Sequence, residues 1–472
     1  MKKTLLIVCI TLMAFVANAQ SKLVGNWEGK IAAGGKEVRL VFKVKESNGK
    51  LSATMDSPDQ GVSGLGVQSA SVNGDTVLFD MSSLGIQYTG MMMGDEIVGV
   101  WMQGGGSIPM ELKKTEAPAE ILKRQTPKPP FDYLSEDVTY QNADKSMTYG
   151  ATITIPKDGK QHPAMILITG SGSQNRDSEI KGHKPFAVIA DYLTKRGYIV
   201  LRVDDRGMGQ TTIGKNPQDL TTLDFVKDVN TGIDYLKTRK EVNTKKIGMI
   251  GHSEGGMIAP MVATERKDVD FVVLMAGPGQ KVTELMEDQN VAIMRTGGVD
   301  EKIISDFRKL YRGVEQAAIS SSSSKEAKSK MDEVAKAWKA VASKEAIELV
   351  GLDGSKKEAE LMGEYMMLYN NKWLNYFIKY DPQPALQKLS CKVLAINGEK
   401  DIQVLAAGNL EGMRQNLAKS KTKNYEVKEL PGLNHLFQTC KKCDTEEYGD
   451  LDETFSPVAL QTIGDWLDKK VK

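Results

Sequence analysis

Histidine, cysteine and long apolar runs are scarce in this sequence, and neither sign of charge dominates. The 472 residues include four histidines and four cysteines, with 62 Lys and Arg against 61 Asp and Glu. This balance gives no basis for binding nucleic acid or an acidic membrane. Beyond the N-terminus, no apolar run is long enough to span a bilayer. We therefore expect a soluble globular protein with a small-molecule partner, no nucleic-acid partner and no membrane span.

The N-terminus has the three parts of a secretory signal. Lys2 and Lys3 are basic, the run from Leu5 to Val16 is apolar, and Ala17-Asn18-Ala19 fits an A-x-A cleavage site. We expect residues 1–19 to be a signal peptide and the mature chain to begin at Gln20. The protein is then periplasmic or secreted.

Three cysteines follow the predicted signal peptide: Cys391, Cys440 and Cys443. This odd number leaves at least one without a partner in the monomer. In an oxidising compartment, the C-x-x-C pair Cys440 and Cys443 forms either a local disulfide or two free thiols. The pattern lacks the two further ligands of a zinc site and the strand–helix setting of a thioredoxin-like motif.

Residues 20–115 have the pattern of a small antiparallel β domain. The runs Glu37 to Val44, Thr76 to Asp80 and Glu96 to Met102 alternate apolar and polar residues and are separated by turn signals. The cluster Met91 to Met93 favours core packing over an adaptable binding surface. Nothing in this domain predicts catalysis, and its role stays open.

A Pro-rich linker, residues 116–130, precedes a second domain at 131–472. There, apolar strands alternate with helices, which predicts an α/β fold with a doubly wound, mainly parallel sheet. The alternation stops between about 282 and 381, where a Lys-, Glu-, Ala- and Met-rich helical segment separates the sixth and seventh main strands. We expect this segment to be a cap over the carboxyl ends of the strands, where ligands bind.

The motif Gly251-His252-Ser253-Glu254-Gly255 fits G-x-S-x-G. It follows a buried strand and precedes a helix, which is the setting of a nucleophile elbow. Glycines two residues either side of the serine allow the strand and the helix to approach closely. The motif predicts that Ser253 is a catalytic nucleophile.

A serine nucleophile needs a general base, and histidine is the usual one. His435 follows the last strand and is the favoured base, with His183 as the second candidate. His162 lies in a polar turn. His252 precedes Ser253, and we expect its side chain to project away from the serine hydroxyl.

The acid that orients the base is expected after the strand Val393 to Asn397. Asp401 is favoured there, and Glu399 is the alternative. The chain order Ser253, Asp401, His435 is the order found in α/β hydrolases.

The substrate oxyanion needs preorganised N–H donors. The backbone N–H of Glu254 supplies one. The second comes from the loop Gly170-Ser171-Gly172-Ser173, where Ser171 is favoured over Gly172. Patterns of phosphate-binding glycine loops are absent.

With these motifs the chain resembles the α/β-hydrolase superfamily. It is most similar to two-domain bacterial carboxylesterases with an N-terminal β domain, which are grouped with serine aminopeptidase-like hydrolases. The resemblance covers nearly the whole mature chain and rests on these stretches: Gly25 to Gly29, Asp56 to Gly61, Gly170 to Asp177, Asp204 to Gly209, Gly251 to Gly256, Trp373 to Pro382 and Gly432 to Gln438. It implies hydrolysis of short acyl esters. One departure is Thr169, where many relatives have a histidine that supports the loop rather than the chemistry.

Two further segments border the predicted site. Arg206 is expected to form an ion pair that shapes the loops, rather than to contact substrate. Met366 to Tyr369 and Trp373 to Phe377 either line an acyl pocket or form the core of the cap.

The sequence thus predicts an exported serine hydrolase that cleaves carboxylic esters without a metal or organic cofactor. One alternative is an aminopeptidase or amidase with the same triad, in which Glu360 and Glu364 hold a substrate ammonium. Another is a binding protein whose β domain captures a glycan or lipid. Acyl length, alcohol identity and oligomeric state are not specified by the sequence.

Overall fold

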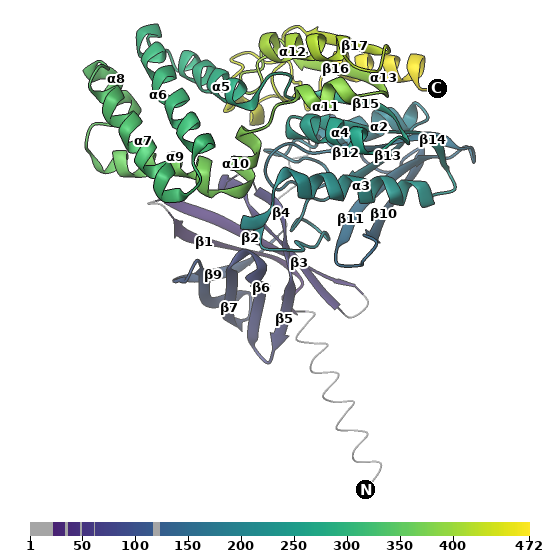
Figure 1. The fold of residues 1–472 in the computed structure, drawn as a ribbon. Coiled ribbons are helices and arrows are strands. Elements are labelled where there is room, and N and C mark those ends of the chain that lie inside the picture. The colour runs from purple at the N-terminus through teal and green to yellow at the C-terminus, as the bar shows by residue number, and fades with distance from the viewer. Residues whose placement is uncertain (1–21, 34–35, 48–49, 61, 117–122) are drawn as a thin grey trace.

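The computed structural model describes residues 22–33, 36–47, 50–60, 62–116 and 123–472. The predicted signal peptide lies outside the described residues. Two sheets fall on either side of the predicted linker, one of nine strands and one of eight (Figure 1). Within the described ranges, no helix is long and apolar enough to cross a membrane.

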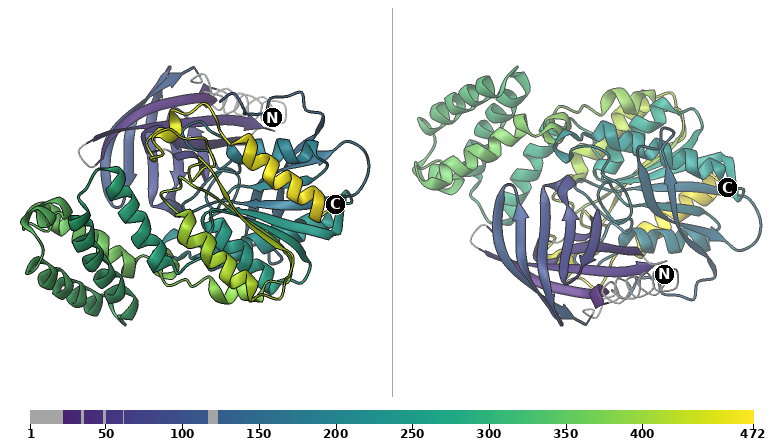
Figure 2. Two further views of the ribbon diagram at one scale, coloured as in Figure 1. Left: turned by 90° about the horizontal axis from the view of Figure 1, so that it is seen from above. Right: turned by 90° about the horizontal axis from the view of Figure 1, so that it is seen from below.

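The N-terminal sheet is antiparallel, in the order β4-β3-β2-β1-β9-β8-β7-β6-β5. Its strands are β1 (Gly25–Ala33), β2 (Lys36–Ser47), β3 (Lys50–Ser57), β4 (Val62–Val67), β5 (Ser69–Asn73), β6 (Thr76–Met81), β7 (Ile86–Met93), β8 (Glu96–Gln103) and β9 (Gly106–Thr115). The sheet curls around an aromatic core (Figure 2). Trp27, Phe42, Phe79 and Tyr88 are fully buried there, so the alternating apolar residues supply a core of their own.

The methionine cluster follows the alternation of strand β7. Met92 is buried, whereas the side chains of Met91 and Met93 are 50% and 68% exposed. The prediction of core packing therefore holds for Met92 and is wrong for the other two. Successive side chains of a strand point to opposite faces, so three consecutive residues cannot share one core.

The C-terminal sheet has the order β10-β11-β13-β12-β14-β15-β16-β17. Strands β10 to β13 are β10 (Tyr133–Gln141), β11 (Thr148–Pro156), β12 (His162–Ile168) and β13 (Ile199–Val203). Strands β14 to β17 are β14 (Val242–His252), β15 (Val269–Met275), β16 (Lys392–Gly398) and β17 (Tyr425–Leu430). Strands β10 and β11 pair antiparallel, and so do β11 and β13. The remaining neighbours in this order, from β13 and β12 to β16 and β17, pair parallel. The fold is that of an α/β hydrolase, as predicted.

Helices cover both faces of this sheet, which is why its strands are apolar on both sides. The packing helices are α2 (Pro185–Lys195), α3 (Thr222–Thr238), α4 (Glu254–Glu265), α11 (Gln383–Lys388), α12 (Ala406–Ala418) and α13 (Pro457–Lys470). In β12, Ile166 packs with α3 and α4, and the next residue, Leu167, packs with α2 and α13. The carboxyl ends of the strands therefore meet at one edge, between the two helical layers.

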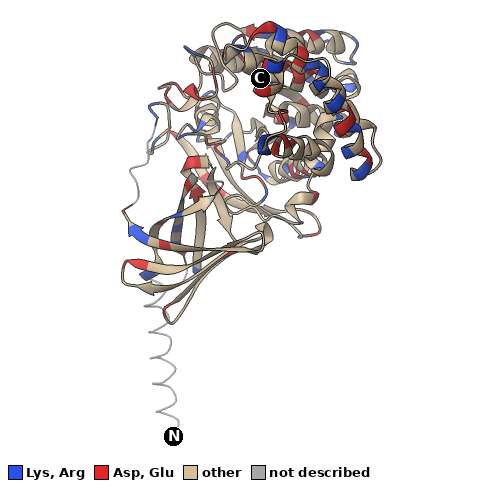
Figure 3. Ribbon diagram, turned by 90° about the vertical axis from the view of Figure 1, so that its left-hand side faces the viewer, with Lys and Arg blue, Asp and Glu red and all other residues tan. Residues whose placement is uncertain are grey.

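Seven helices lie between β15 and β16, and the six that precede α11 form the cap. They are α5 (Val282–Thr296), α6 (Glu301–Ser320), α7 (Ser324–Lys339), α8 (Lys344–Val350), α9 (Lys356–Asn370) and α10 (Lys372–Ile378). Helices α6 to α9 extend to one side of the molecule around their own core, while α5 and α10 return to the sheet (Figures 1 and 2). Acidic and basic residues are mixed over the helices on the side drawn in Figure 3, which is typical of a solvated surface.

Candidate active site

Ser253 lies between the end of β14 and the start of α4, at the expected elbow. Its backbone has φ 55° and ψ −117°, a conformation that is strained for a residue with a side chain. The Ser253 N–H donates to the carbonyl of Met275 at 2.9 Å, and the Ser253 carbonyl accepts from Gly256 N at 2.8 Å. A Cβ added at Gly251 would collide with the carbonyl oxygen of Gly255. These backbone contacts hold the strained turn.

His435 and Asp401 are buried and hydrogen-bonded to each other. His435 Nδ1 lies 2.8 Å from Asp401 Oδ2. Asp401 Oδ1 accepts from the backbone N–H groups of Gln403 at 2.8 Å and Val404 at 2.9 Å. A carboxylate oxygen only accepts, so Nδ1 carries the proton and Nε2 is left as an acceptor. Glu399, the alternative acid, is on the surface and instead accepts from Gly432 N at 3.0 Å.

Ser253, His435 and Ser171 line one cavity of about 750 Å³. The loop that carries Ser171 passes directly beside the nucleophile, because a Cβ added at Gly170 would lie 3.1 Å from Ser253 Cβ. Glu254 begins α4, where the first backbone N–H groups have no partner within the helix and the helix dipole favours negative charge. The structure therefore brings together the residues predicted for the oxyanion and the nucleophile.

Asp205, which was not singled out from the sequence, contacts the residues on either side of the oxyanion loop, Gly170 to Ser173. Thr169 Oγ1 donates to the Asp205 carboxyl group at 2.8 Å, and Gln174 N donates to it at 2.9 Å. Burial raises the pKa of Asp205 to about 8. Thr169 thus takes part in a hydrogen bond that fixes the start of the loop.

The side chain of Glu254 links the cap to the base of the site. Its Oε1 accepts from Thr222 Oγ1 at 2.7 Å and from Trp373 Nε1 at 2.9 Å. Burial raises the pKa of Glu254, and the hydrogen bonds from Trp373 and Thr222 act in the opposite direction. The hydrogen bond from Trp373 therefore ties α10 to Glu254, the residue that follows the nucleophile.

His252 contacts the general base, a role that the sequence did not predict. Its ring packs 4.7 Å from the His435 ring, and its Nε2 lies 2.9 Å from the His435 carbonyl oxygen. Burial, followed by the nearby His435, lowers the pKa of His252 to about 3. Because a carbonyl accepts, the neutral ring carries its proton on Nε2. No pattern in the sequence indicated this contact, which joins two segments far apart in the chain.

The two remaining histidines lie elsewhere. His183, the second candidate base, is buried with its Nδ1 2.8 Å from Thr454 Oγ1, and burial lowers its pKa to about 4. His162 contacts Asp158 and the carbonyl of Gly197. Neither is among the described residues that line the cavity with Ser253.

The cap supplies a mainly apolar wall to the cavity. Leu285, Met286 and Gln289 come from α5, and Trp373, Leu374 and Phe377 come from α10. Within 373–377, the interpretation as pocket lining therefore holds for these three residues, and Leu374 also packs against the core of the cap. Met366 and Tyr369 instead pack against the core of the cap, where helical apolar stripes usually lie.

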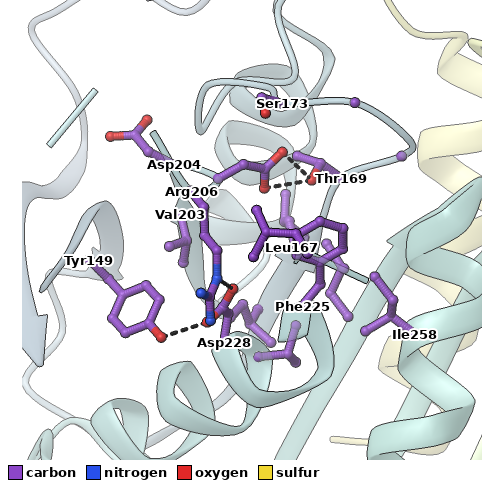
Figure 4. Close-up of a pocket in the computed structure, with 17 residues that line it drawn as sticks. Tyr149, Leu167, Thr169, Ser173, Val203, Asp204, Arg206, Phe225, Asp228 and Ile258 are labelled. Carbon is purple, nitrogen blue, oxygen red and sulfur yellow. Dashed lines mark hydrogen bonds and ion pairs between the residues drawn. The ribbon is translucent and has the colours of Figure 1, made fainter. Parts of the chain in front are cut away.

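A second, smaller cavity of about 70 Å³ lies behind the oxyanion loop (Figure 4). Arg206 and Tyr149 both point to Asp228 in it. Arg206 Nε lies 2.6 Å from Asp228 Oδ2, and Tyr149 OH donates to Oδ1 at 2.6 Å. Arg206 therefore forms the ion pair expected from the sequence, beneath the loop that carries Ser171.

The cysteines lie outside the catalytic cluster. Cys440 and Cys443 form a disulfide in the loop that follows His435, and Cys391 is a buried free cysteine.

Residues 183–343 match the model of the serine aminopeptidase S33 family. Esterase EstD of Thermotoga maritima is 38% identical over 163 residues, covering 34% of this chain and 38% of the relative. Human dipeptidyl peptidase 8 is 26% identical over 174 residues, covering 35% of this chain and 19% of the relative. The chain thus spans well under half the length of these curated relatives.

The comparison with solved structures also finds two esterases. An esterase of Pyrococcus furiosus, Pf2001, has a TM-score of 0.43 at 14% identity, covering 72% of this chain and 92% of that one. Est1E of Butyrivibrio proteoclasticus, solved with ferulic acid, has a TM-score of 0.40 at 16% identity, covering 71% and 99%.

Proposed function

We propose that this chain, an α/β hydrolase with an N-terminal β domain, is an exported serine esterase that cleaves carboxylic esters at Ser253. The main support is the site itself. A strained serine elbow shares a cavity with His435, and Asp401 accepts the His435 Nδ1 proton at 2.8 Å. The similarity to esterase EstD supports an ester as the substrate.

In the proposed reaction, His435 Nε2 takes the Ser253 proton while Oγ attacks the ester carbonyl. The negative oxygen of the tetrahedral intermediate is stabilised by the backbone N–H groups of Glu254 and Ser171. The intermediate collapses as His435 protonates the departing alcohol, which leaves an acyl group on Ser253. His435 then deprotonates a water molecule, whose oxygen attacks the acyl carbonyl. The second tetrahedral intermediate collapses as its bond to Ser253 Oγ breaks and His435 returns the proton to Oγ, which releases the carboxylic acid. Asp401 stabilises the imidazolium in both steps.

Short acyl groups are the proposed preference. The acyl group would lie against the apolar wall of α5 and α10, and the same cavity must also hold the alcohol. A series of p-nitrophenyl esters from acetate to dodecanoate tests this. We expect kcat/KM to be highest for the short members and to be abolished by Ser253→Ala. Turnover that survives in the Ser253→Ala variant would contradict the proposed nucleophile.

Amide hydrolysis by the same residues is the second candidate, and the S33 family match favours it. Glu360 and Glu364, the predicted ammonium ligands, are exposed on α9 and are not among the described residues that line the cavity. Esters and anilides with the same acyl group separate the two activities. We expect the ester to be preferred, whereas a higher kcat/KM for the anilide would favour the peptidase.

Export is proposed from the N-terminal signal pattern of residues 1–19, and the Cys440–Cys443 disulfide fits an oxidising compartment. Mass spectrometry of the protein recovered from the expressing cells tests this. We expect a mature N-terminus at Gln20, whereas a retained Met1 in active protein would contradict cleavage.

A further inference from the structure

The β domain forms part of the candidate active site. Gln60, from the short 3-10 helix Pro58–Gln60 after β3, and Val62 and Ser63, from the start of β4, line the same cavity as Ser253 and His435. The cavity is therefore built between the two domains, and the hydrolase sheet alone does not complete it.

Backbone pairing holds the β domain in this position. Gly66 N donates to the Gly207 carbonyl at 2.8 Å, and Gly209 N donates to the Gly64 carbonyl at 2.9 Å. Between them, Leu65 forms an antiparallel bridge with Met208. The strand β4 thus docks on the loop after β13. A Cβ added at Gly66 would lie 3.1 Å from the Gly207 oxygen, so any side chain there would crowd the backbone of this loop.

The same docking places β4 beside the oxyanion loop. A Cβ added at Gly64 would lie 3.6 Å from Asn175 Cβ, and Asn175 also lines the cavity. Gly64 N donates to Asp56 Oδ1 at 2.8 Å, and Asp56 pairs with Lys43 at 2.5 Å. The start of β4, which carries Ser63, is therefore held on one side by its own sheet and on the other by the hydrolase domain.

The cap and the rest of the lining differ in polarity. Five of the six cap side chains that line the cavity are apolar, and the sixth is Gln289. The β domain and three loops supply more amide and hydroxyl side chains, beside the apolar Val62, Ile180, Val404 and Leu436: Gln60, Ser63, Asn175, Ser178, Gln403 and Tyr448. Among the described residues that line the cavity, none is lysine or arginine, and the one carboxylate near this wall, Glu179, accepts from Asn175 Nδ2 at 3.1 Å and lies 4.0 Å from Lys184 Nζ.

Amides and hydroxyls both donate and accept hydrogen bonds, so this wall matches a ligand rich in hydroxyl groups. Gln60 already accepts from Ser57, Ser178 donates to Gln174, and Gln403 donates to Tyr448. Each of these amides and hydroxyls keeps a further donor or acceptor site, to which a ligand hydroxyl can bond and an apolar group cannot. The absence of basic residues on the described wall gives no partner for an anionic group.

We propose that the β domain, through Ser63 and Gln60, binds the alcohol part of the ester, and that this alcohol is an uncharged polyhydroxylated group such as a saccharide. This inference rests on the proposed esterase function. It assigns the acyl group to the cap wall and the sugar to the wall shared by the β domain and the oxyanion loop.

The test uses two acetate esters that differ only in the alcohol, 6-O-acetylglucose and methyl acetate, with acetate release followed in a pH-stat. The variant Ser63→Trp fills the polar side of the cavity. We expect it to lower kcat/KM for the sugar ester by at least about ten-fold while methyl acetate changes by less than about two-fold. Ser63→Ala, which removes only a hydroxyl, should raise KM for the sugar ester alone. The matched control is Ser52→Trp, at an exposed position of β3 in the same domain.

Labelling by a fluorophosphonate shows whether each variant keeps an assembled catalytic centre. An equal loss on both esters, or no loss on either, would overturn the inference while leaving the esterase function intact. A wild-type protein that cleaves methyl acetate but not the sugar ester would do the same. Failure to cleave any ester, together with no fluorophosphonate adduct, would instead overturn the proposed function.

Discussion

The substitution Asp401→Asn tests the electrostatic arrangement of the site. Asp401 Oδ1 accepts from the N–H groups of Gln403 and Val404, so an asparagine would place its carbonyl oxygen there. Its NH₂ group would then face His435 Nδ1, which sits 2.8 Å from the other carboxylate oxygen. His435 would have to accept at Nδ1 and carry its proton on Nε2. In that tautomer it cannot take the proton of Ser253.

The size of the effect follows from this tautomer change. A serine triad held in the wrong tautomer loses on the order of 10⁴-fold in kcat, which corresponds to about 5 kcal/mol of transition-state stabilisation. The two backbone hydrogen bonds are kept, so the free energy of unfolding should fall by no more than about 1.5 kcal/mol. The variant should therefore be folded and nearly inactive.

The assay is steady-state hydrolysis of p-nitrophenyl acetate, with thermal unfolding followed in parallel. The matched control is Glu399→Gln, which neutralises the neighbouring exposed acid that the sequence left as the alternative. We expect the control to keep kcat within about three-fold of the wild type, as for a surface charge of little energetic weight. An Asp401→Asn variant that retains more than a tenth of kcat, or a large loss in Glu399→Gln, would refute the assignment.

Three further predictions follow from the contacts around the elbow. The pKa of Asp205 is about 8 in the folded protein and about 3.9 in the unfolded chain, so the free energy of unfolding falls as pH rises from about 4 to 8. Asp205→Asn should flatten that fall. The same pH dependence of the free energy of unfolding in variant and wild type would contradict it. His252→Phe removes the donor to the His435 carbonyl and should lower kcat about ten-fold, whereas His252→Gln can keep the donor and should lose less; equal losses would argue against the hydrogen bond. Gly255→Ala places a Cβ against the Ile168 carbonyl and should cost more than about 3 kcal/mol in urea unfolding, so a variant as stable as the wild type would contradict the packing of the elbow.

The parts of the site that the sequence predicts are those fixed by local geometry and strand order. The G-x-S-x-G motif needs only a strand, a turn and a helix that are contiguous in sequence, and the structure places Ser253 in that turn. Asp401 and His435 follow adjacent parallel strands, β16 and β17, whose carboxyl ends meet at one edge of the sheet. Their contact could therefore be predicted without knowing any distance.

The parts that could not be predicted depend on contacts between distant segments that leave no sequence pattern. The docking of β4 uses backbone groups of Gly64 and Gly66, so no side-chain pattern marks it. The contact of His252 with His435 depends on how the loop after β17 folds back over the elbow. The role of Asp205 depends on both ends of the oxyanion loop reaching one buried carboxyl group.

The central claim is that Ser253 is a nucleophile activated by its surroundings, and covalent labelling tests it most directly. The mature protein and its Ser253→Ala variant would be incubated with a fluorophosphonate and compared by intact-mass measurement. The account predicts one adduct on the native protein and none on the variant. No adduct on the native protein, or an adduct that persists in Ser253→Ala, would contradict it.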